Sequence, residues 1–180
     1  MRRDDSLFSV EVVCMMTFCI IGKGTALCTA HFESPLGAWR LAWCDRGLVC
    51  SSSRNDDFAC KGATASEAPG WLQREWEKFW LGSEVALTLC SFKEPSEFAL
   101  AVYRVVSAIP AGSTSTYKDV ALHVGNPKAA RAVGAIMRAN PWAPFVPCHR
   151  VIGSDGRMCG YGGPGGVGMK SEFLEYERSL

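Results

Sequence analysis

The chain has 180 residues, of which 48% are hydrophobic and 21% charged, a balance typical of one or two folded domains. Its 19 basic and 18 acidic side chains nearly cancel, so the total charge does not indicate a nucleic-acid partner. The charge is unevenly spread, because residues 1–95 carry 10 basic and 12 acidic side chains whereas residues 96–180 carry 9 and 6. The sign of this difference suits a second half that binds DNA.

The nine cysteines form no C-x-x-C pair, and their odd number excludes complete pairing within the chain. We therefore expect reduced thiols and a cytoplasmic protein. The first third contains six potential metal ligands, none at the spacing of a zinc finger or knuckle: Cys14, Cys19, Cys28, His31, Cys44 and Cys50. The spacing predicts no structural metal site.

Residues 1–26 do not have the pattern of a signal peptide or a membrane span. Acidic residues follow the two N-terminal arginines, and Glu11 interrupts the apolar run that comes next. That run is also too short to cross a bilayer. We predict a disordered extension that leads into the first strand.

The segment that follows is rich in β-forming residues. Strands are predicted at 27–32 and 38–44, separated by the turn ESPLG, and a third strand follows the turn DRG. Residues 51–70 are polar and rich in turn formers, which predicts a loop. A further short strand is expected at 86–92.

The stretch GWLQREWEKFWLG predicts an amphipathic helix that ends at Gly82. Leu72, Trp76, Phe79 and Trp80 share one face of it, at i, i+4, i+7 and i+8. Four large apolar side chains could line a cofactor, but such a face normally packs into a core. We expect a core face here.

The second half begins with a helix that Ser96 can cap and that ends at the turn IPAG. A short helix is predicted next, capped by Thr116 with Asp119 three residues later and running to Val124. The apolar face of the first of these helices contains five residues: Phe98, Val102, Val105, Val106 and Ile109.

Gly125 can form a tight turn, after which Asn126 caps a third helix and Pro127 takes its first position. Two short helices joined by a glycine turn predict a helix-turn-helix. In the third helix, which runs to about residue 139, Arg131 is surrounded by small residues: Ala129, Ala130, Ala132, Gly134 and Ala135. Small side chains let a helix approach another surface closely, either a neighbouring helix or, on an exposed face, a DNA groove.

The stretch PCHRVIG, residues 147–153, places Cys148 beside His149. A buried, unreactive core thiol is the usual state of a cysteine. A free thiol has a pKa of about 8.5 and is mostly protonated at pH 7, so a nucleophile needs a base. Consecutive side chains on a strand point to opposite faces, so contact requires either a backbone turn at this point or a bridging water.

A base at such a site usually has an orienting carboxylate. The C-terminal stretch MKSEFLEYERSL predicts a helix that offers three: Glu172, Glu175 and Glu177. Phe173 and Leu174 face the core, and Glu177 lies on the same inward side, four residues after Phe173. If this relay activates Cys148, the pKa of its thiol should lie well below the usual value.

Three stretches, RAVGAIMRANP, PCHRVIGSDGRMCGYGG and KSEFLEYE, resemble the O6-alkylguanine-DNA alkyltransferases in order and spacing. GSTSTYKDVA is similar to the segment ahead of that family's helix-turn-helix, and ESPLGAWRLAWCDRGL to its N-terminal domain. The resemblance implies an α+β/α/β chain. After an extension at 1–26, a small ribonuclease-H-like sheet domain spans 27–94, and a helical catalytic domain with a helix-turn-helix spans 95–180.

The resemblance also implies a reaction. O6-alkylguanine, and as a second candidate O4-alkylthymine, is rotated out of the double helix and passes its alkyl group irreversibly to Cys148. His149 takes the thiol proton through a water, and Glu177 orients and charges the imidazole. Asn140 braces the turn between the recognition helix and Cys148.

Substrate contacts are implied in the same way. Tyr117 contacts guanine N3 and the 3′ phosphate, while the carbonyls of Cys148 and Val151 accept from the guanine amino group. Tyr161 and the backbone amide of Gly162 lie on the side of the leaving oxygen.

For DNA, the resemblance implies that Arg131 fills the gap left by the rotated base, while Ala130 and Gly134 belong to the helix that enters the minor groove. The implied partner is double-stranded DNA containing O6-alkylguanine, bound by a monomer without a cofactor or a membrane.

Zinc-binding family members use cysteine and histidine ligands in the first domain. Cys44 falls at one such position, but Val49 stands where a histidine is needed, so we expect no metal.

Other classes of function share parts of the pattern. A zinc-dependent nucleobase deaminase needs P-C-x-x-C, but the next cysteine after Cys148 is Cys159, which excludes that class. Alkyltransferase-like proteins bind alkylated DNA without repairing it, yet they lack the reactive cysteine. A transcriptional regulator built on the helix-turn-helix would leave the PCHRV chemistry without a purpose, although fused regulator-repair proteins exist.

Overall fold

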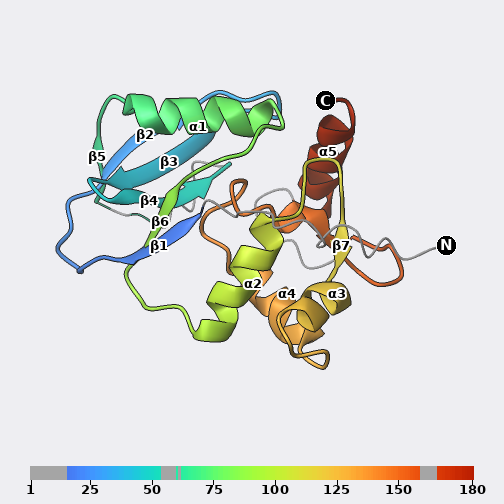
Figure 1. The fold of residues 1–180 in the computed structure, drawn as a ribbon. Helices are drawn as coiled ribbons and strands as arrows, with labels where there is room; N and C mark the ends of the chain where they lie inside the picture. Colours follow the sequence, from blue (N-terminus) through green and yellow to red (C-terminus); the bar gives the residue numbers. More distant parts are fainter. Residues whose placement is uncertain (1–15, 54–59, 61, 159–165) are drawn as a thin grey trace.

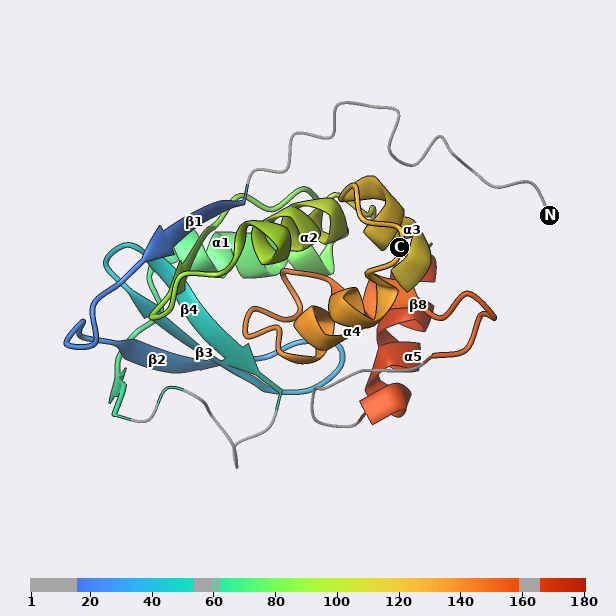
Figure 2. The same ribbon diagram turned by 90° about the horizontal axis from the view of Figure 1, so that it is seen from below.

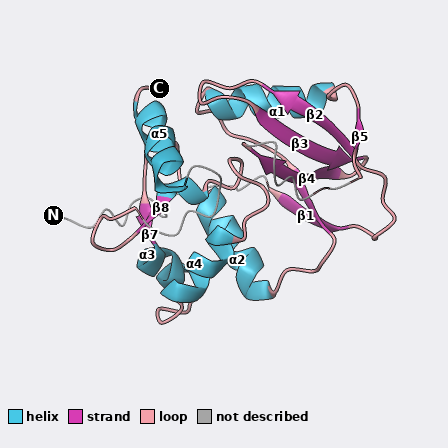
Figure 3. Cartoon of the chain, turned by 180° about the vertical axis from the view of Figure 1, so that it is seen from behind, coloured by secondary structure: helices cyan, strands magenta, loops and turns pink. Residues whose placement is uncertain are grey.

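The computed structural model describes residues 16–53, 60, 62–158 and 166–180. A mixed sheet with strand order β1-β6-β4-β3-β2-β5 forms one half of the described chain, and helices dominate the other (Figures 1 and 3). The strands are β1 (Thr17–Ile20), β2 (Cys28–Phe32), β3 (Trp39–Cys44), β4 (Gly47–Ser52), β5 (Thr64–Ala65) and β6 (Thr88–Ser91). β2, β3 and β4 pair antiparallel, while β1, β5 and β6 join the sheet through parallel pairs.

One face of this sheet is covered by α1 (Gly70–Trp80) (Figure 1). The apolar face predicted for this helix is buried as expected: Leu72, Trp76, Phe79 and Trp80. The Trp76 ring packs edge-on against Phe32 and Trp39 of the sheet, with centroids 5.5 and 5.9 Å away. Phe79 also packs against Phe145 and Phe173, so one core joins the sheet to the helical half.

The other face of the sheet carries a smaller core that is rich in thiols. A bulge in β4 adds a residue to this core: Ala42 pairs with Cys50 and Trp43 with Leu48, which leaves Val49 as the extra residue. Leu48 therefore faces α1, whereas Val49 and Cys50 both reach the opposite face. Its cysteines are Cys19, Cys44, Cys50, Cys60 and Cys90, and we call them the sheet thiols.

The start of the sheet differs from the expected boundaries. Thr17–Ile20 pairs in parallel with Thr88–Ser91 over four residues, so part of the segment assigned to an N-terminal extension is a sheet strand. The pairing could not be inferred from periodicity, because it joins segments about seventy residues apart. The expected disorder at residues 1–15 falls outside the described residues.

The helical half contains α2 (Glu97–Ser107), α3 (Tyr117–His123), α4 (Ala130–Arg138) and α5 (Gly166–Arg178) (Figure 2). The caps predicted at Ser96 and Thr116 are confirmed. The Ser96 hydroxyl accepts from the Ala99 amide at 3.2 Å, and the Thr116 hydroxyl accepts from the Asp119 amide at 3.1 Å.

The predicted start of the third helix is wrong by three residues. Asn126 and Pro127 belong to a separate turn, in which the Asn126 carbonyl accepts from the Ala129 amide at 2.9 Å, and α4 begins at Ala130. Gly125 makes the preceding turn with a φ of 76°, a value that glycine adopts without strain. The two helices still pack against each other as the pattern predicted.

Three short elements of the helical half were not predicted. Cys148–Arg150 forms a 3-10 turn, and β8 (Val151–Ile152) pairs in parallel with β7 (Ser115–Thr116). This pairing places the first residue of α3, Tyr117, beside the segment that carries Cys148. No helix among the described residues is long and apolar enough to span a membrane.

Candidate active site

Cys148 stands at the start of the 3-10 turn, directly after Pro147. The backbone therefore turns at this point, while the link between the Cys148 thiol and the His149 ring stays a prediction. Cys148 is only 6% exposed. The Asn140 side-chain amide is placed to donate to its thiol, while the Cys148 backbone amide donates to the Val146 carbonyl at 2.8 Å.

Burial dominates the acidity of the Cys148 thiol and raises its pKa above the ordinary value. The Asn140 hydrogen bond and the positive charge of Lys170 act in the opposite direction but do not outweigh burial. The expectation of a strongly lowered pKa is therefore wrong for the protein without substrate. The thiol is protonated at neutral pH and must lose its proton during the reaction.

His149 is fully buried and is held between an aromatic ring and a carboxylate. Its ring stacks on Phe173 at 4.5 Å and 20°, and its Nε2 lies 2.9 Å from Glu177 Oε1. Burial lowers the pKa of His149 more than Glu177 raises it. The imidazole is therefore neutral at pH 7, and Nδ1 makes no hydrogen bond to the described residues.

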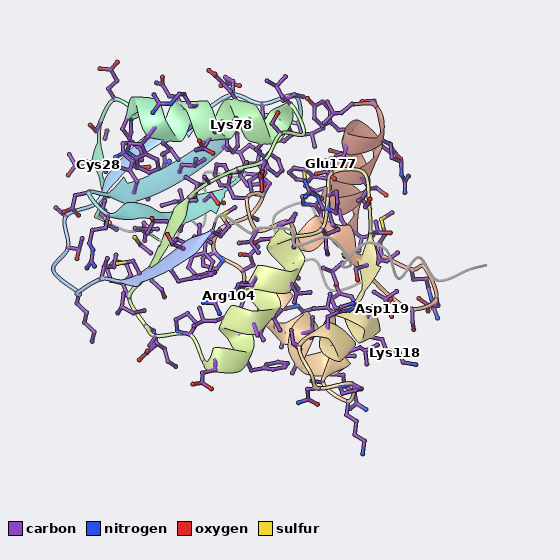
Figure 4. The ribbon with its side chains drawn as sticks, viewed as in Figure 1. Cys28, Lys78, Arg104, Lys118, Asp119 and Glu177 are labelled. Carbon is purple, nitrogen blue, oxygen red and sulfur yellow. The ribbon has the colours of Figure 1, made fainter. Side chains whose placement is uncertain are left out.

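Glu177 lies on the inward side of α5, as predicted (Figure 4). Burial opposes its ionisation, but the hydrogen bonds from His149 and Arg150 and the positive charge of Arg150 outweigh burial and lower its pKa to about 2. The Arg150 guanidinium donates to both carboxylate oxygens, with Nη2 2.6 Å from Oε1. The Gly112 amide adds a bond of 3.0 Å to Oε2.

Asn140 spans the loop between α4 and the nucleophile. Its side-chain amide donates to the Val146 carbonyl at 2.8 Å, and its Oδ1 accepts from the Trp142 amide at 3.1 Å. Together with the bond to the Cys148 thiol, these contacts hold both ends of the loop. They are the contacts that a bracing side chain makes.

Lys170 and Arg150 are two site residues that sequence reasoning missed. Lys170 is fully buried, and its Nζ donates to the Val151 carbonyl and lies 3.4 Å from the Tyr117 hydroxyl. A signal for it existed, since Lys170, Phe173 and Glu177 are at i, i+3 and i+7 on one inward face. For Arg150 no comparable periodicity exists.

A groove of about 630 Å³ lies between α3, α4 and the loop after β8. Its lining brings together four of the predicted residues: Tyr117, Ala130, Arg131 and Gly134. Gly134 lies against the Tyr117 ring: a β-carbon added at Gly134 would be 3.8 Å from the nearest ring atom. Lys118 and Arg138 add positive charge to the rim, and Lys118 lies on the outer side of α3 (Figure 4).

Other predicted site residues are not in this groove. Val151 is buried beside it in β8. Tyr161 and Gly162 lie outside the described residues. Among the residues that the structure describes, no group of three or more His, Cys, Asp or Glu side chains is arranged to hold a metal ion.

Comparison with known proteins places this site in a family. A family model described as "6-O-methylguanine DNA methyltransferase, DNA binding domain" matches residues 97–179. A methylated-DNA–protein-cysteine methyltransferase of Methanosarcina barkeri is 36% identical over 157 residues, which cover 82% of this chain and 94% of that relative. The chain belongs to the methylated-DNA–protein-cysteine methyltransferase family.

Solved structures extend the match of this methyltransferase to both halves of the chain. The Mycobacterium tuberculosis O6-methylguanine methyltransferase is 30% identical with a TM-score of 0.73, covering 85% of this chain and 93% of that one. The M. tuberculosis OGT protein in complex with DNA is 32% identical with a TM-score of 0.68, covering 86% of this chain and 93% of that one.

Proposed function

We propose that this methyltransferase repairs DNA by direct reversal, moving the alkyl group of O6-alkylguanine in double-stranded DNA onto Cys148. The observation that carries the proposal is the place of Lys170, whose charge acts on the buried Cys148 thiol and whose Nζ lies 3.4 Å from the hydroxyl of Tyr117, in a groove that Arg131 also lines. The buried His149–Glu177 pair supplies the base that a protonated thiol needs.

The transfer is a displacement at carbon. The sulfur of Cys148 forms a bond to the alkyl carbon, the bond from that carbon to O6 breaks, and its electrons go to the guanine. The thiol proton passes to His149, the displaced guanine anion takes up a proton from solvent and becomes the normal base, and the imidazolium then returns its proton to solvent. Water cannot displace the resulting thioether at neutral pH, so each protein molecule reacts once.

The protonation states support a general-base role for His149. Its Nε2 faces Glu177, so Nδ1 is the nitrogen that remains to receive the proton of Cys148, through a water as the family resemblance implies. Glu177 stabilises the imidazolium that forms, and Arg150 keeps Glu177 ionised. The burial that raises the Cys148 pKa also leaves the new thiolate poorly solvated and therefore reactive.

For DNA, we assign α3 and α4 to a helix-turn-helix in the helical domain (95–180) and the preceding sheet to a ribonuclease-H-like domain (27–94, with β1 added). The exposed Arg131 fills the place of the rotated base, while Ala130 and Gly134 let α4 approach the minor groove.

The Val151 carbonyl has two roles in this proposal. It accepts from the buried ammonium of Lys170, and a carbonyl oxygen can accept a second hydrogen bond, here from the guanine amino group. Tyr117, which lines the groove and lies beside Lys170, contacts the base and the 3′ phosphate. The roles of Tyr161 and Gly162 on the leaving-oxygen side stay predictions.

The test is the intact mass of the protein after incubation with a duplex oligonucleotide that contains one O6-methylguanine. Repair adds one methyl group per molecule and restores guanine. Cys148→Ala should gain no mass but still bind the duplex. Binding by the wild-type protein without any mass change would favour the alternative, a non-catalytic protein that recognises alkylated DNA.

A further inference from the structure

The loop between α4 and Cys148 rests on the sheet, which belongs to the other half of the chain. The Ser51 amide, near the end of β4, donates to the Pro141 carbonyl at 2.9 Å. The Ser51 hydroxyl donates to the Ala143 carbonyl and lies 3.4 Å from the Pro141 carbonyl. Two backbone carbonyls of the loop are thus held by one serine.

The neighbouring strand β6 holds the residue between them. Trp142 is 1% exposed, and its Nε1 donates to the Cys90 carbonyl at 3.2 Å. The ring packs edge-on against Phe18 of β1 and Tyr103 of α2, with centroids 5.7 and 5.2 Å away. The position of Trp142 is therefore determined by both halves of the molecule.

The residues held by these contacts directly follow Asn140, the side chain that donates to the Cys148 thiol. Asn140 precedes Pro141, and its Oδ1 accepts from the Trp142 amide. The same side chain donates from its nitrogen to Val146 and to the Cys148 thiol. A shift of the loop would therefore move the Asn140 amide relative to the sulfur.

We propose that the Ser51 hydroxyl and the Trp142 indole, which we call the sheet clamp, are positioning groups that set the distance from Asn140 to Cys148 and thereby the reactivity of the thiol. The inference rests on the proposed function in that Cys148 is the nucleophile. Its physical basis is that a buried thiolate depends on a few well-placed donors, and a misplacement of about 1 Å can cost about a hundredfold in rate.

The clamp can be removed with little change to the sheet. The ladder of β4 is made by backbone groups, and Ser51 keeps its backbone bond to Pro141 in any substitution. Ser51→Ala removes only the hydroxyl, and Trp142→Phe keeps an aromatic ring but loses the N–H. Ser51→Thr restores a hydroxyl and serves as the rescue.

A matched control exists in the same sheet. The Thr29 hydroxyl of β2 donates to the Leu41 carbonyl at 2.9 Å, a bond of the same kind that does not touch the active-site loop. Thr29→Val therefore removes a hydroxyl-to-carbonyl bond without affecting the clamp. The rates of Thr29→Val therefore show how much the reaction slows when the sheet loses one such hydrogen bond away from the active-site loop.

The experiment measures two rates at Cys148 as a function of pH: reaction with free O6-benzylguanine, and alkylation by iodoacetamide followed by mass spectrometry. We expect Ser51→Ala and Trp142→Phe each to slow both reactions about three- to tenfold and to move the pH profiles upward. The double variant should be slower than either, while Ser51→Thr and Thr29→Val should behave as wild type.

Unchanged rates and pH profiles in the double variant would overturn the proposal. So would an equal loss in Thr29→Val, because the effect would then follow stability and not position. The iodoacetamide arm separates this inference from the repair function. If the wild type takes no alkyl group from O6-alkylguanine yet the clamp variants slow iodoacetamide, the proposed function fails and the clamp stands.

Discussion

The sheet thiols and Cys148 differ in what surrounds the sulfur. Among the sheet thiols, Cys44 Sγ is 3.9 Å from Cys90 Sγ, and burial with the neighbouring thiols raises the pKa of Cys90 to about 12. Cys148 is as buried, but it has an amide donor, a nearby ammonium and a buried histidine. Burial alone makes a thiol inert, and the polar neighbours decide whether it can react.

The largest effect expected from this difference is selectivity. After reaction with O6-methylguanine DNA, peptide mapping should find the methyl group on Cys148 and on none of the other eight cysteines, because the proposed transfer uses the base His149, which follows Cys148 directly in the chain. Label spread over several cysteines, or more than one turnover per molecule, would contradict the assignment.

Delivery of the base can be separated from the chemistry at the thiol. Arg131→Ala should slow repair of duplex DNA by about ten- to a thousandfold, because the variant no longer compensates the cost of rotating a base out of the stack. Reaction with free O6-benzylguanine needs no rotation and should stay near the wild-type rate. Equal losses on both substrates would mean that Arg131 supports the fold instead.

Glu177 links the site to stability, because its pKa falls from 4.5 to about 2 on folding. A carboxyl group with a lowered pKa in the folded state stabilises the protein at pH values above its unfolded pKa. Here the contribution is on the order of 3 kcal/mol, and it is lost as the pH falls towards 2. The lowered pKa of His149 adds a loss below about 6.5, since the unfolded chain then binds more protons.

Glu177→Gln should therefore destabilise the protein at pH 7 by about 3 kcal/mol and flatten the acid part of the stability curve. Urea unfolding at several pH values measures both effects. The exposed Glu175→Gln on the same helix is the control and should keep the wild-type curve. A Glu177→Gln curve parallel to that of wild type would show that the carboxylate does not carry this linkage.

Lys170 tests the electrostatic part of the comparison. Lys170→Met keeps an unbranched side chain, one atom shorter, but removes the charge that lowers the Cys148 pKa, so reaction with free O6-benzylguanine should slow about tenfold at pH 7. The pH profile should move upward. The half-exposed Lys78 pairs with Glu75 on α1, and Lys78→Met should have no such effect. An unmoved profile for Lys170→Met would assign its role to packing.

The sequence predicts those contacts of this site whose two residues are close together along the chain. The caps at Ser96 and Thr116 are local bonds three residues long, and the inward face of the last helix is a local periodicity, so both were predictable. The bonds from Ser51 to the active-site loop and from Arg150 to Glu177 join residues 92 and 27 positions apart. No local pattern encodes such pairs, because the first depends on how the two halves pack and the second on how α5 packs against the 3-10 turn.

The start of α4 shows a second limit. The Asn-Pro pair is a common helix start, yet here it forms a turn of its own, since the Asn126 carbonyl is used by Ala129. The lowered thiol pKa was inferred from the presence of a base. The structure shows that burial outweighs the hydrogen bonds and charges that would lower it.

The smallest effect should come from the sheet thiols themselves. Cys44→Ala removes one partner of the Cys44–Cys90 contact and a small part of a buried surface, which should cost about 1 kcal/mol of stability. The bond from Trp142 to the Cys90 backbone remains, so the rate of alkyl transfer should stay within about twofold of wild type. Thermal unfolding and the O6-benzylguanine rate, measured on the same preparation, check both statements. A large loss of transfer rate with unchanged stability would show that the Cys44–Cys90 contact affects the position of the active-site loop through β6. The sheet thiols would then contribute to the reactivity of Cys148, and the two could not be treated as independent.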